Sequence, residues 1–133
     1  MQLYTGLDLV EIERIARAIE RRGERFLCKV YTAEERAICG GRVASLAGRW
    51  AAKEAVAKLL GVGLRGPGAA PDAVALHEIA TLRDASGRPC VAIGGRAAAH
   101  AQRLGIAQIA ISISHTQTTV AASAVALGGA GAA

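Results

Sequence analysis

The first residues whose types and spacing could do chemistry are two carboxylates and a lysine. Asp8 interrupts an apolar stretch, where a carboxylate is costly to bury unless it meets a cation or several hydrogen-bond donors. Glu54 and Lys58 are four residues apart, which places them on one face of a helix. Two interpretations stay open for each. Asp8 either caps the next helix or binds a metal. Glu54 and Lys58 form either a surface ion pair or a metal ligand beside a phosphate-binding cation.

Mg²⁺ suits this pair of carboxylates better than zinc, because no cluster of histidines or cysteines accompanies them. Proteins commonly hold Mg²⁺ with one or two carboxylates, while waters and substrate phosphates complete its six ligands. The chain has 16 Lys and Arg against 11 Asp and Glu, a net charge of +5, and a basic balance favours an anionic partner. The sequence therefore predicts a Mg²⁺ site for a phosphate-rich substrate. Lys53, on another face of the same helix, is predicted to be solvated.

His115 ends the string Ser112-Ile113-Ser114-His115. It is either part of a polar-capped hairpin turn or a donor at the end of a sheet, placed to bind an anion. A Ser-His-Asp triad fits poorly, because no strand–turn–helix signal surrounds either serine.

Four arginines follow one another in three- and four-residue steps: Arg14, Arg17, Arg21 and Arg25. They share one face if the first helix runs that far, although Gly23 could end it earlier. Such a face is either simply solvated or a docking surface for an acidic partner, whose carboxylates match the fork geometry of arginine.

Composition excludes several classes of protein. A length of 133 residues predicts a single domain over 1–133. The aromatic fraction of 3% argues against a nucleic-acid binder that stacks bases. No apolar run is long enough to predict a membrane span. Three widely spaced cysteines predict reduced thiols and hence a cytoplasmic location.

Periodicity predicts an α+β fold in which helices pack on one face of an antiparallel sheet. The predicted strands cover 3–10, 75–83, 89–93, 109–115 and 120–127, and the predicted helices 11–22, 33–39, 43–60 and 95–104. Residues 64–72 are predicted to be a loop, and 128–133 a frayed tail. Thr32 with Glu35 is a capping-box pattern at the start of the second helix.

Four strings together resemble the holo-acyl-carrier-protein synthase family of 4′-phosphopantetheinyl transferases. They are GLDLVEIERI at 6–15, AGRWAAKEA at 47–55, GRP at 87–89 and SISH at 112–115. The first two are specific in combination, and the other two add weight because they stand in the expected order. The resemblance covers residues 3 to about 127.

The resemblance implies a Mg²⁺-dependent transfer of the 4′-phosphopantetheine arm of coenzyme A to a serine of an apo acyl carrier protein, with release of 3′,5′-ADP. Asp8 and Glu54 would be the metal ligands, and Lys58, the third catalytic residue, would contact the coenzyme A phosphates. His115 would also contact coenzyme A. The carrier supplies the nucleophile, and the base that takes its proton is either Glu54 or a metal-bound water.

The remaining expectations concern the coenzyme A site and the partners. The resemblance implies that Arg49, Gly87, Arg88 and Pro89 line the coenzyme A site. It also implies that the arginines from Arg14 onward dock the acidic helix of the carrier. It also implies a homotrimer with active sites between subunits. The segment 40–44 is shorter than in many relatives, which leaves Arg42 as a candidate for the coenzyme A 3′-phosphate. The alternative function is a non-catalytic basic module that binds acidic carriers or nucleic acid through its first helix.

Overall fold

Five α-helices and five strands make up the part of the chain that the structure, a computed structural model, describes, namely residues 1–129. In chain order the elements are β1 (Gln2–Glu11), α1 (Ile12–Arg22), α2 (Glu24–Val30), α3 (Ala33–Cys39), α4 (Val43–Leu60), the 3₁₀ turn η1 (Leu76–Glu78), β2 (Ile79–Arg83), β3 (Pro89–Ile93), α5 (Gly95–Arg103), β4 (Ile106–His115) and β5 (Thr119–Gly128).

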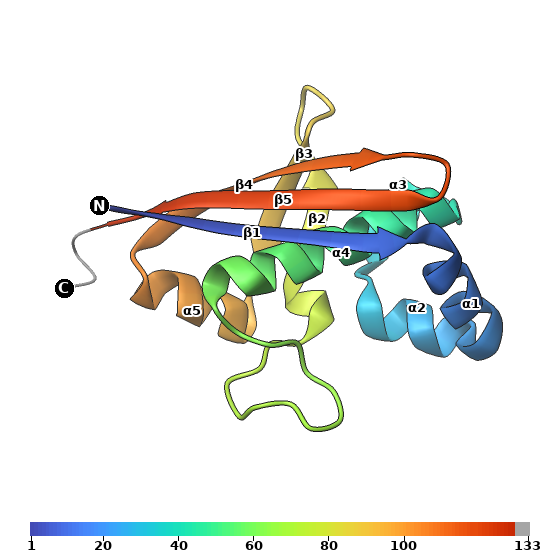
Figure 1. Cartoon of the computed structure of the whole chain (residues 1–133), viewed down its shortest axis with the longest axis horizontal. Coiled ribbons are helices and arrows are strands. Elements are labelled where there is room, and N and C mark those ends of the chain that lie inside the picture. The colour runs from blue at the N-terminus through green and yellow to red at the C-terminus, as the bar shows by residue number, and fades with distance from the viewer. Residues whose placement is uncertain (130–133) are drawn as a thin grey trace.

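A three-stranded antiparallel sheet of order β1-β5-β4 forms one layer of the fold, and the helices form the other (Figure 1). The central strand β5 pairs with β1 along its whole length, from Gln2↔Gly128 to Glu11↔Thr119. α4 runs directly beneath this sheet. The predicted α+β class, with helices on one face of an antiparallel sheet, is therefore confirmed.

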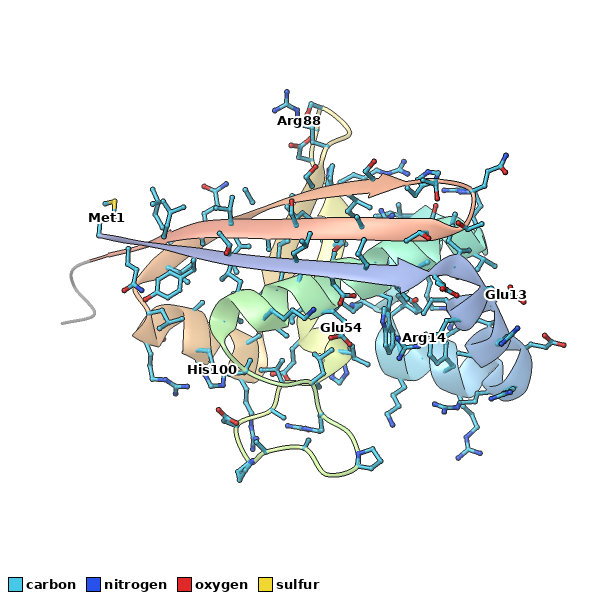
Figure 2. The ribbon with its side chains drawn as sticks, viewed as in Figure 1. Met1, Glu13, Arg14, Glu54, Arg88 and His100 are labelled. Atoms are coloured by element: carbon cyan, nitrogen blue, oxygen red, sulfur yellow. The ribbon has the colours of Figure 1, made fainter. Side chains whose placement is uncertain are left out.

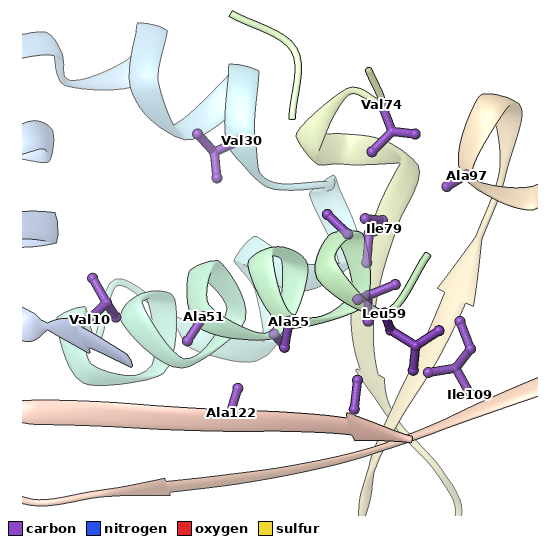
Figure 3. Packing of buried hydrophobic residues seen from close by; sticks show 14 of the residues in the cluster. Val10, Val30, Ala51, Ala55, Leu59, Val74, Ile79, Ala97, Ile109 and Ala122 are labelled. Carbon is purple, nitrogen blue, oxygen red and sulfur yellow. The ribbon is translucent and has the colours of Figure 1, made fainter. Parts of the chain in front are cut away.

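Small residues let α4 approach the sheet closely. Along β1 the inward side carries Gly6, Asp8 and Val10, because side chains alternate between the two faces of a strand. The helix meets the sheet with small side chains, and Ala51 and Ala55 have no exposed surface. Figure 3 shows both alanines beside Ala122 of β5. This close layer brings the carboxylate of β1 next to the middle of α4.

Local sequence signals located α3 and α4 correctly. Thr32 Oγ1 accepts a hydrogen bond from Glu35 N at 3.1 Å, and Glu35 Oε1 accepts one from Thr32 N at 3.0 Å, which is the predicted capping box. The bounds of α4 are those predicted. Gly23 ends α1, with a φ of +55° that favours glycine, and the chain continues at once into α2, a helix that was not predicted.

Two predicted strand boundaries need correction. The predicted strand over 75–83 begins only at Ile79, because residues 76–78 form η1. β2 and β3 pair with each other as a separate hairpin, whose tip projects beyond the main sheet (Figure 1). Gly128, assigned to the frayed tail, pairs with Gln2 and Ile106 as the end of β5. Residues 130–133 of that predicted tail lie outside the described residues.

Candidate active site

Asp8 and Lys58 meet where β1 crosses α4. Lys58 Nζ donates a hydrogen bond to Asp8 Oδ1 at 3.0 Å and another to the Leu7 carbonyl at 2.9 Å. The Asp8 side chain is only 15% exposed, whereas that of Lys58 is 54% exposed. Gly6 makes this crossing possible, because a Cβ at its position would overlap the Ala55 carbonyl. The ion pair of Lys58 is thus with Asp8, across 50 residues of sequence.

Glu54 shares this site with Asp8. Burial, and then the negative charge of Asp8, raise the pKa of the half-buried Glu54 carboxyl, and the positive charges of Lys58 and Arg14 oppose that rise. Two carboxylates and one exposed ammonium meet here, and Arg14 adds a second positive charge nearby. We call Asp8, Glu54 and Lys58 the acidic group; Figure 2 shows Glu54 beneath β1.

The acidic group has the donors that a magnesium ion needs from a protein. Carboxylate oxygens are the ligands Mg²⁺ prefers, and a cation between Asp8 and Glu54 would relieve the like charge that raises the pKa of Glu54. Within residues 1–129 no group of three or more His, Cys, Asp or Glu side chains is gathered in a way that could hold a metal ion. Asp8 and Glu54 therefore fit an ion whose other ligands are waters and substrate.

A second group of candidate residues surrounds a cavity of about 260 Å³ between α4, β4 and the β2–β3 hairpin. We call it the basic cavity. Its lining consists of Ala44, Ser45, Gly48, Arg49, Arg83, Gly87, Pro89, Ile113 and His115. Four of the residues expected to line a coenzyme A site thus come together although they are far apart in sequence. Arg88 does not line the cavity; Figure 2 shows it at the hairpin tip.

The basic cavity is equipped to bind an anion. Arg49 is 7% exposed, and its Nε is buried with no hydrogen-bond partner among the described residues. An unpaired buried donor is costly, so a ligand that accepts from it is favoured. Arg83 adds a second guanidinium that sequence analysis missed, since nothing near 83 in the sequence indicates that the hairpin folds back onto α4. Arg42 is not in the lining, and its guanidinium donates to the Ile38 carbonyl at 2.8 Å.

The acidic group and the basic cavity lie toward opposite edges of the sheet. Asp8 is level with Ala122 of β5, which is level with Ile113 of β4 beside the cavity. Two strand spacings separate the first from the last, about 10 Å. In one chain, therefore, β5 stands between Asp8 and the β4 side of the basic cavity.

The arginines of α1 gather over a third hollow, which we call the arginine face. It has a volume of about 320 Å³ and is lined by Glu11, Glu13, Arg14, Arg17, Ala18, Arg21 and Arg22. The guanidinium of Arg14 lies 5.7 Å from the centre of the Trp50 ring, one helical turn before Glu54. Arg25 lies beyond Gly23 on α2 and is not part of this lining, so the helix does not run far enough to include it.

The prediction that Lys53 is solvated is wrong. Its side chain is 0% exposed and forms an ion pair with Glu35, also 0% exposed, at 2.6 Å. The partner residue is 18 positions away and on another helix, so no local pattern revealed the pair.

Residues 4–122 match the 4′-phosphopantetheinyl transferase superfamily. The chain belongs to this superfamily. The holo-[acyl-carrier-protein] synthase of Roseiflexus castenholzii is 56% identical to this transferase over 110 residues, which are 83% of this chain and 80% of that protein. The holo-[acyl-carrier-protein] synthase of Chloroflexus aggregans is 51% identical over 132 residues, 93% of this chain and 94% of that one.

Solved structures agree with the sequence relatives. The Helicobacter pylori holo-[acyl-carrier-protein] synthase in complex with coenzyme A superposes with a TM-score of 0.80 at 25% identity, over 92% of this chain and 99% of that one. The Chronobacterium ammoniagenes ACPS–CoA complex gives 0.81 at 33% identity, over 97% and 99%. The family recognised from the four strings is thereby confirmed, as is the assignment of this transferase as an enzyme. Among the described residues, no helix is long and apolar enough to cross a membrane.

Proposed function

We propose that this transferase moves the 4′-phosphopantetheine group of coenzyme A to a serine of an apo acyl carrier protein and releases 3′,5′-ADP. The observation that carries the proposal is the meeting of Asp8, Glu54 and Lys58 where β1 crosses α4. The serine oxygen would bond to the phosphorus on the pantetheine side, and the bond from that phosphorus to the oxygen of 3′,5′-ADP would break. The serine proton passes to a base, Glu54 or a water.

The acidic group would act by positioning and by charge. Asp8 and Glu54 are the residues that would hold Mg²⁺, and Lys58, with its more exposed ammonium, would reach the phosphates. When bound, Mg²⁺ would neutralise charge on the pyrophosphate and its leaving oxygen. Lys58 is already oriented by Asp8 and by the Leu7 carbonyl, so it needs little rearrangement to meet an anion.

The basic cavity would hold the nucleotide end of coenzyme A. His115, Gly87 and Pro89 line this cavity, and Arg49 with Arg83 would supply the positive charge for the 3′-phosphate. The unpaired Nε of Arg49 supports this role. Arg88, at the hairpin tip, lies outside the cavity lining, so it would contact only a part of coenzyme A that extends beyond the cavity.

The arginine face would dock the carrier protein. Four arginines, Arg14, Arg17, Arg21 and Arg22, surround one hollow on α1, which suits the carboxylates of an acidic helix. Arg14 also touches Trp50, one turn from Glu54, so a docked carrier would lie next to the acidic group. Arg25 would add charge from α2 at the margin of this surface.

We further infer that a complete active site forms between copies of the chain, in a homotrimer. The acidic group and the basic cavity lie toward opposite edges of one sheet, so a neighbouring copy is needed to bring one of each together. The outer face of the same sheet is exposed and apolar, with Leu3, Leu7, Leu9, Val125 and Leu127 between 42% and 65% exposed. An apolar patch of this kind favours a protein interface.

The whole chain, residues 1–133, is proposed to act as one transferase domain in the cytoplasm. One hydrophobic cluster includes residues of every α-helix and of both sheets, which supports a single domain. Cys28, Cys39 and Cys90 are all free thiols, which supports a reducing compartment.

A transfer assay tests the proposal. The chain is incubated with an apo carrier, coenzyme A and Mg²⁺, and the carrier is then weighed by mass spectrometry. We expect a mass gain of one phosphopantetheine that is lost in EDTA. If no carrier in a panel of fatty-acid and polyketide carriers gains mass, while the chain still binds them, the non-catalytic binding module would be favoured instead.

A further inference from the structure

A buried ion pair lies behind the turn of α4 that carries Glu54. Lys53 Nζ donates hydrogen bonds to Glu35 Oε1 at 2.6 Å, to the Leu76 carbonyl at 3.1 Å and to the Ile79 carbonyl at 2.5 Å. Three acceptors match the three N–H groups of an ammonium, whereas a neutral amine has two. We call this the Lys53–Glu35 pair, and it is a charged pair with no exposed surface.

Glu35 is held from several elements at once. Its Oε1 also accepts from Thr32 N at 3.0 Å, and its Oε2 accepts from Thr81 N at 2.9 Å. The Lys53–Glu35 pair therefore ties α4 to α3, to η1 and to β2 through directional bonds. Removing either partner would leave a buried charge without compensation.

The small side chains on the sheet side of α4 do little to fix how the helix is rotated. Its larger buried side chains, Leu46, Val56, Leu59 and Leu60, are apolar and add packing without hydrogen bonds. Where α4 faces the sheet it presents small residues, namely Ala47, Gly48, Ala51, Ala52 and Ala55. Helices pack in a defined orientation when ridges of side chains enter grooves, and such small side chains make shallow ridges. On the sheet side, α4 is located by Gly6 against the Ala55 carbonyl and by the hydrogen bonds of the half-exposed Lys58 to Asp8 and the Leu7 carbonyl. Glu54 thus lies between two anchored neighbours, residue 53 and residue 55.

We propose that Lys53 and Glu35 are positioning residues, which hold α4 at the rotation that places the Glu54 carboxylate opposite Asp8. The inference rests on the proposed function, because it concerns the metal that Asp8 and Glu54 would share. The side chains of Lys53 and Glu35 have no exposed surface, so neither would touch metal or substrate. Their importance follows from geometry, since losing a residue that orients a metal ligand typically costs about 10- to 100-fold in metal affinity.

Two variants, Lys53→Met and Glu35→Gln, test the proposal through metal binding. Mn²⁺ serves as the probe ion, and its binding is followed by loss of the free-ion electron paramagnetic resonance signal, with coenzyme A present and carrier absent. We expect the dissociation constant for Mn²⁺ to rise at least 10-fold in both, the range typical when a residue behind a ligand is lost. In the transfer assay the Mg²⁺ activation constant should rise by the same factor, while the rate at saturating Mg²⁺ falls less than about 3-fold.

Matched core variants separate positioning from stability. Val56→Ala and Leu46→Ala remove buried side chains of the same helix, and the one that lowers the unfolding temperature as much as Lys53→Met is the control. The dissociation constant of this control for Mn²⁺ should stay within about 2-fold of that of the unchanged chain. The proposal is overturned if the control loses as much affinity, or if the pair variants bind Mn²⁺ normally. If Lys53→Met does not fold, Glu35→Gln decides, since it keeps an oxygen for Lys53. Failure of the unchanged chain to bind Mn²⁺ and to transfer would instead overturn the proposed function.

Discussion

At the scale of single residues, the candidate chemistry depends on two carboxylates, Asp8 and Glu54, that lie close together. Glu54 is half-buried beside Asp8, and both burial and the neighbouring carboxylate raise its pKa. Lys58 offsets only part of this, because its ammonium is bonded to Asp8 and to the Leu7 carbonyl. A site that is unfavourable for its own carboxylates gains most from a bound divalent cation.

Neutralising either carboxylate should therefore abolish transfer without harming the fold. We expect Asp8→Asn and Glu54→Gln each to lower the transfer rate at least about 100-fold, because the cation loses one of its two protein ligands. Circular dichroism and thermal melts should show folded protein. Glu34→Gln, an exposed carboxylate of α3, is the matched control and should keep full activity. Full activity in either site variant would contradict the metal assignment.

The raised pKa of Glu54 also predicts how stability depends on pH. A carboxyl whose pKa is higher in the folded than in the unfolded chain contributes stability that is present at low pH and lost as pH rises through the folded pKa. Glu54→Gln removes that loss. In EDTA, the unfolding temperature of Glu54→Gln should thus rise relative to the unchanged chain between about pH 4 and pH 7, as followed by circular dichroism. A difference that stays constant or shrinks over this range would show that burial of Glu54 costs nothing.

The arginine face should matter for the carrier and not for coenzyme A. We expect Arg14→Glu to weaken carrier binding about 10-fold or more, because a cation that meets an acidic helix becomes an anion. Coenzyme A binding, measured by calorimetry, should change less than 2-fold. Arg103→Glu, the same charge change at the end of α5, is the control. An equal loss of affinity for the carrier and for coenzyme A in Arg14→Glu would contradict the docking role.

At the scale of elements, the sequence predicted what local signals encode. The Thr32–Glu35 capping box located the start of α3, and the alternating isoleucines of 109–113 located β4. The sequence also indicated the residues of the acidic group, because the strings around Asp8 and Glu54 are distinctive. It missed the burial of Lys53 and the place of Arg83, because their surroundings come from segments distant in sequence. Contacts of that kind follow from tertiary packing, which no periodicity in a single sequence reports.

The crossing of β1 over α4 can be tested at Gly6. A Cβ at this position would overlap the Ala55 carbonyl, so Gly6→Ala must push the strand away from the helix. We expect a loss of about 1–3 kcal/mol in the free energy of unfolding, measured with urea, together with weaker metal binding. Thr5→Ala, on the outward side of the same strand, should cost less than about 1 kcal/mol. A harmless Gly6→Ala would mean that the layers are free to separate without consequence.

At the scale of the whole molecule, the proposed active site would be completed by a neighbouring copy of the chain. The acidic group is at the β1 edge of the sheet and the basic cavity at the β4 edge. The exposed leucines of β1, Leu3, Leu7 and Leu9, lie on the outer face of the sheet. A closed ring of copies would pair the β1 side of each with the β4 side of its neighbour, since head-to-tail contacts that close form rings.

Such an arrangement predicts complementation between two inactive variants. Asp8→Asn lacks the acidic group and Arg49→Ala lacks the basic cavity, so each homotrimer should be inactive. If the two are unfolded together and refolded as a 1:1 mixture, a site is intact when an Arg49→Ala copy supplies the acidic group to an Asp8→Asn neighbour. Random assembly gives this order at about a quarter of the sites, so activity should return to about 25% of that of the unchanged chain. Refolding each variant alone is the control, and Leu7→Glu in both partners, which charges the apolar face, should prevent recovery. No recovery in the mixture, with trimers confirmed by light scattering, would show that each site is completed within one chain.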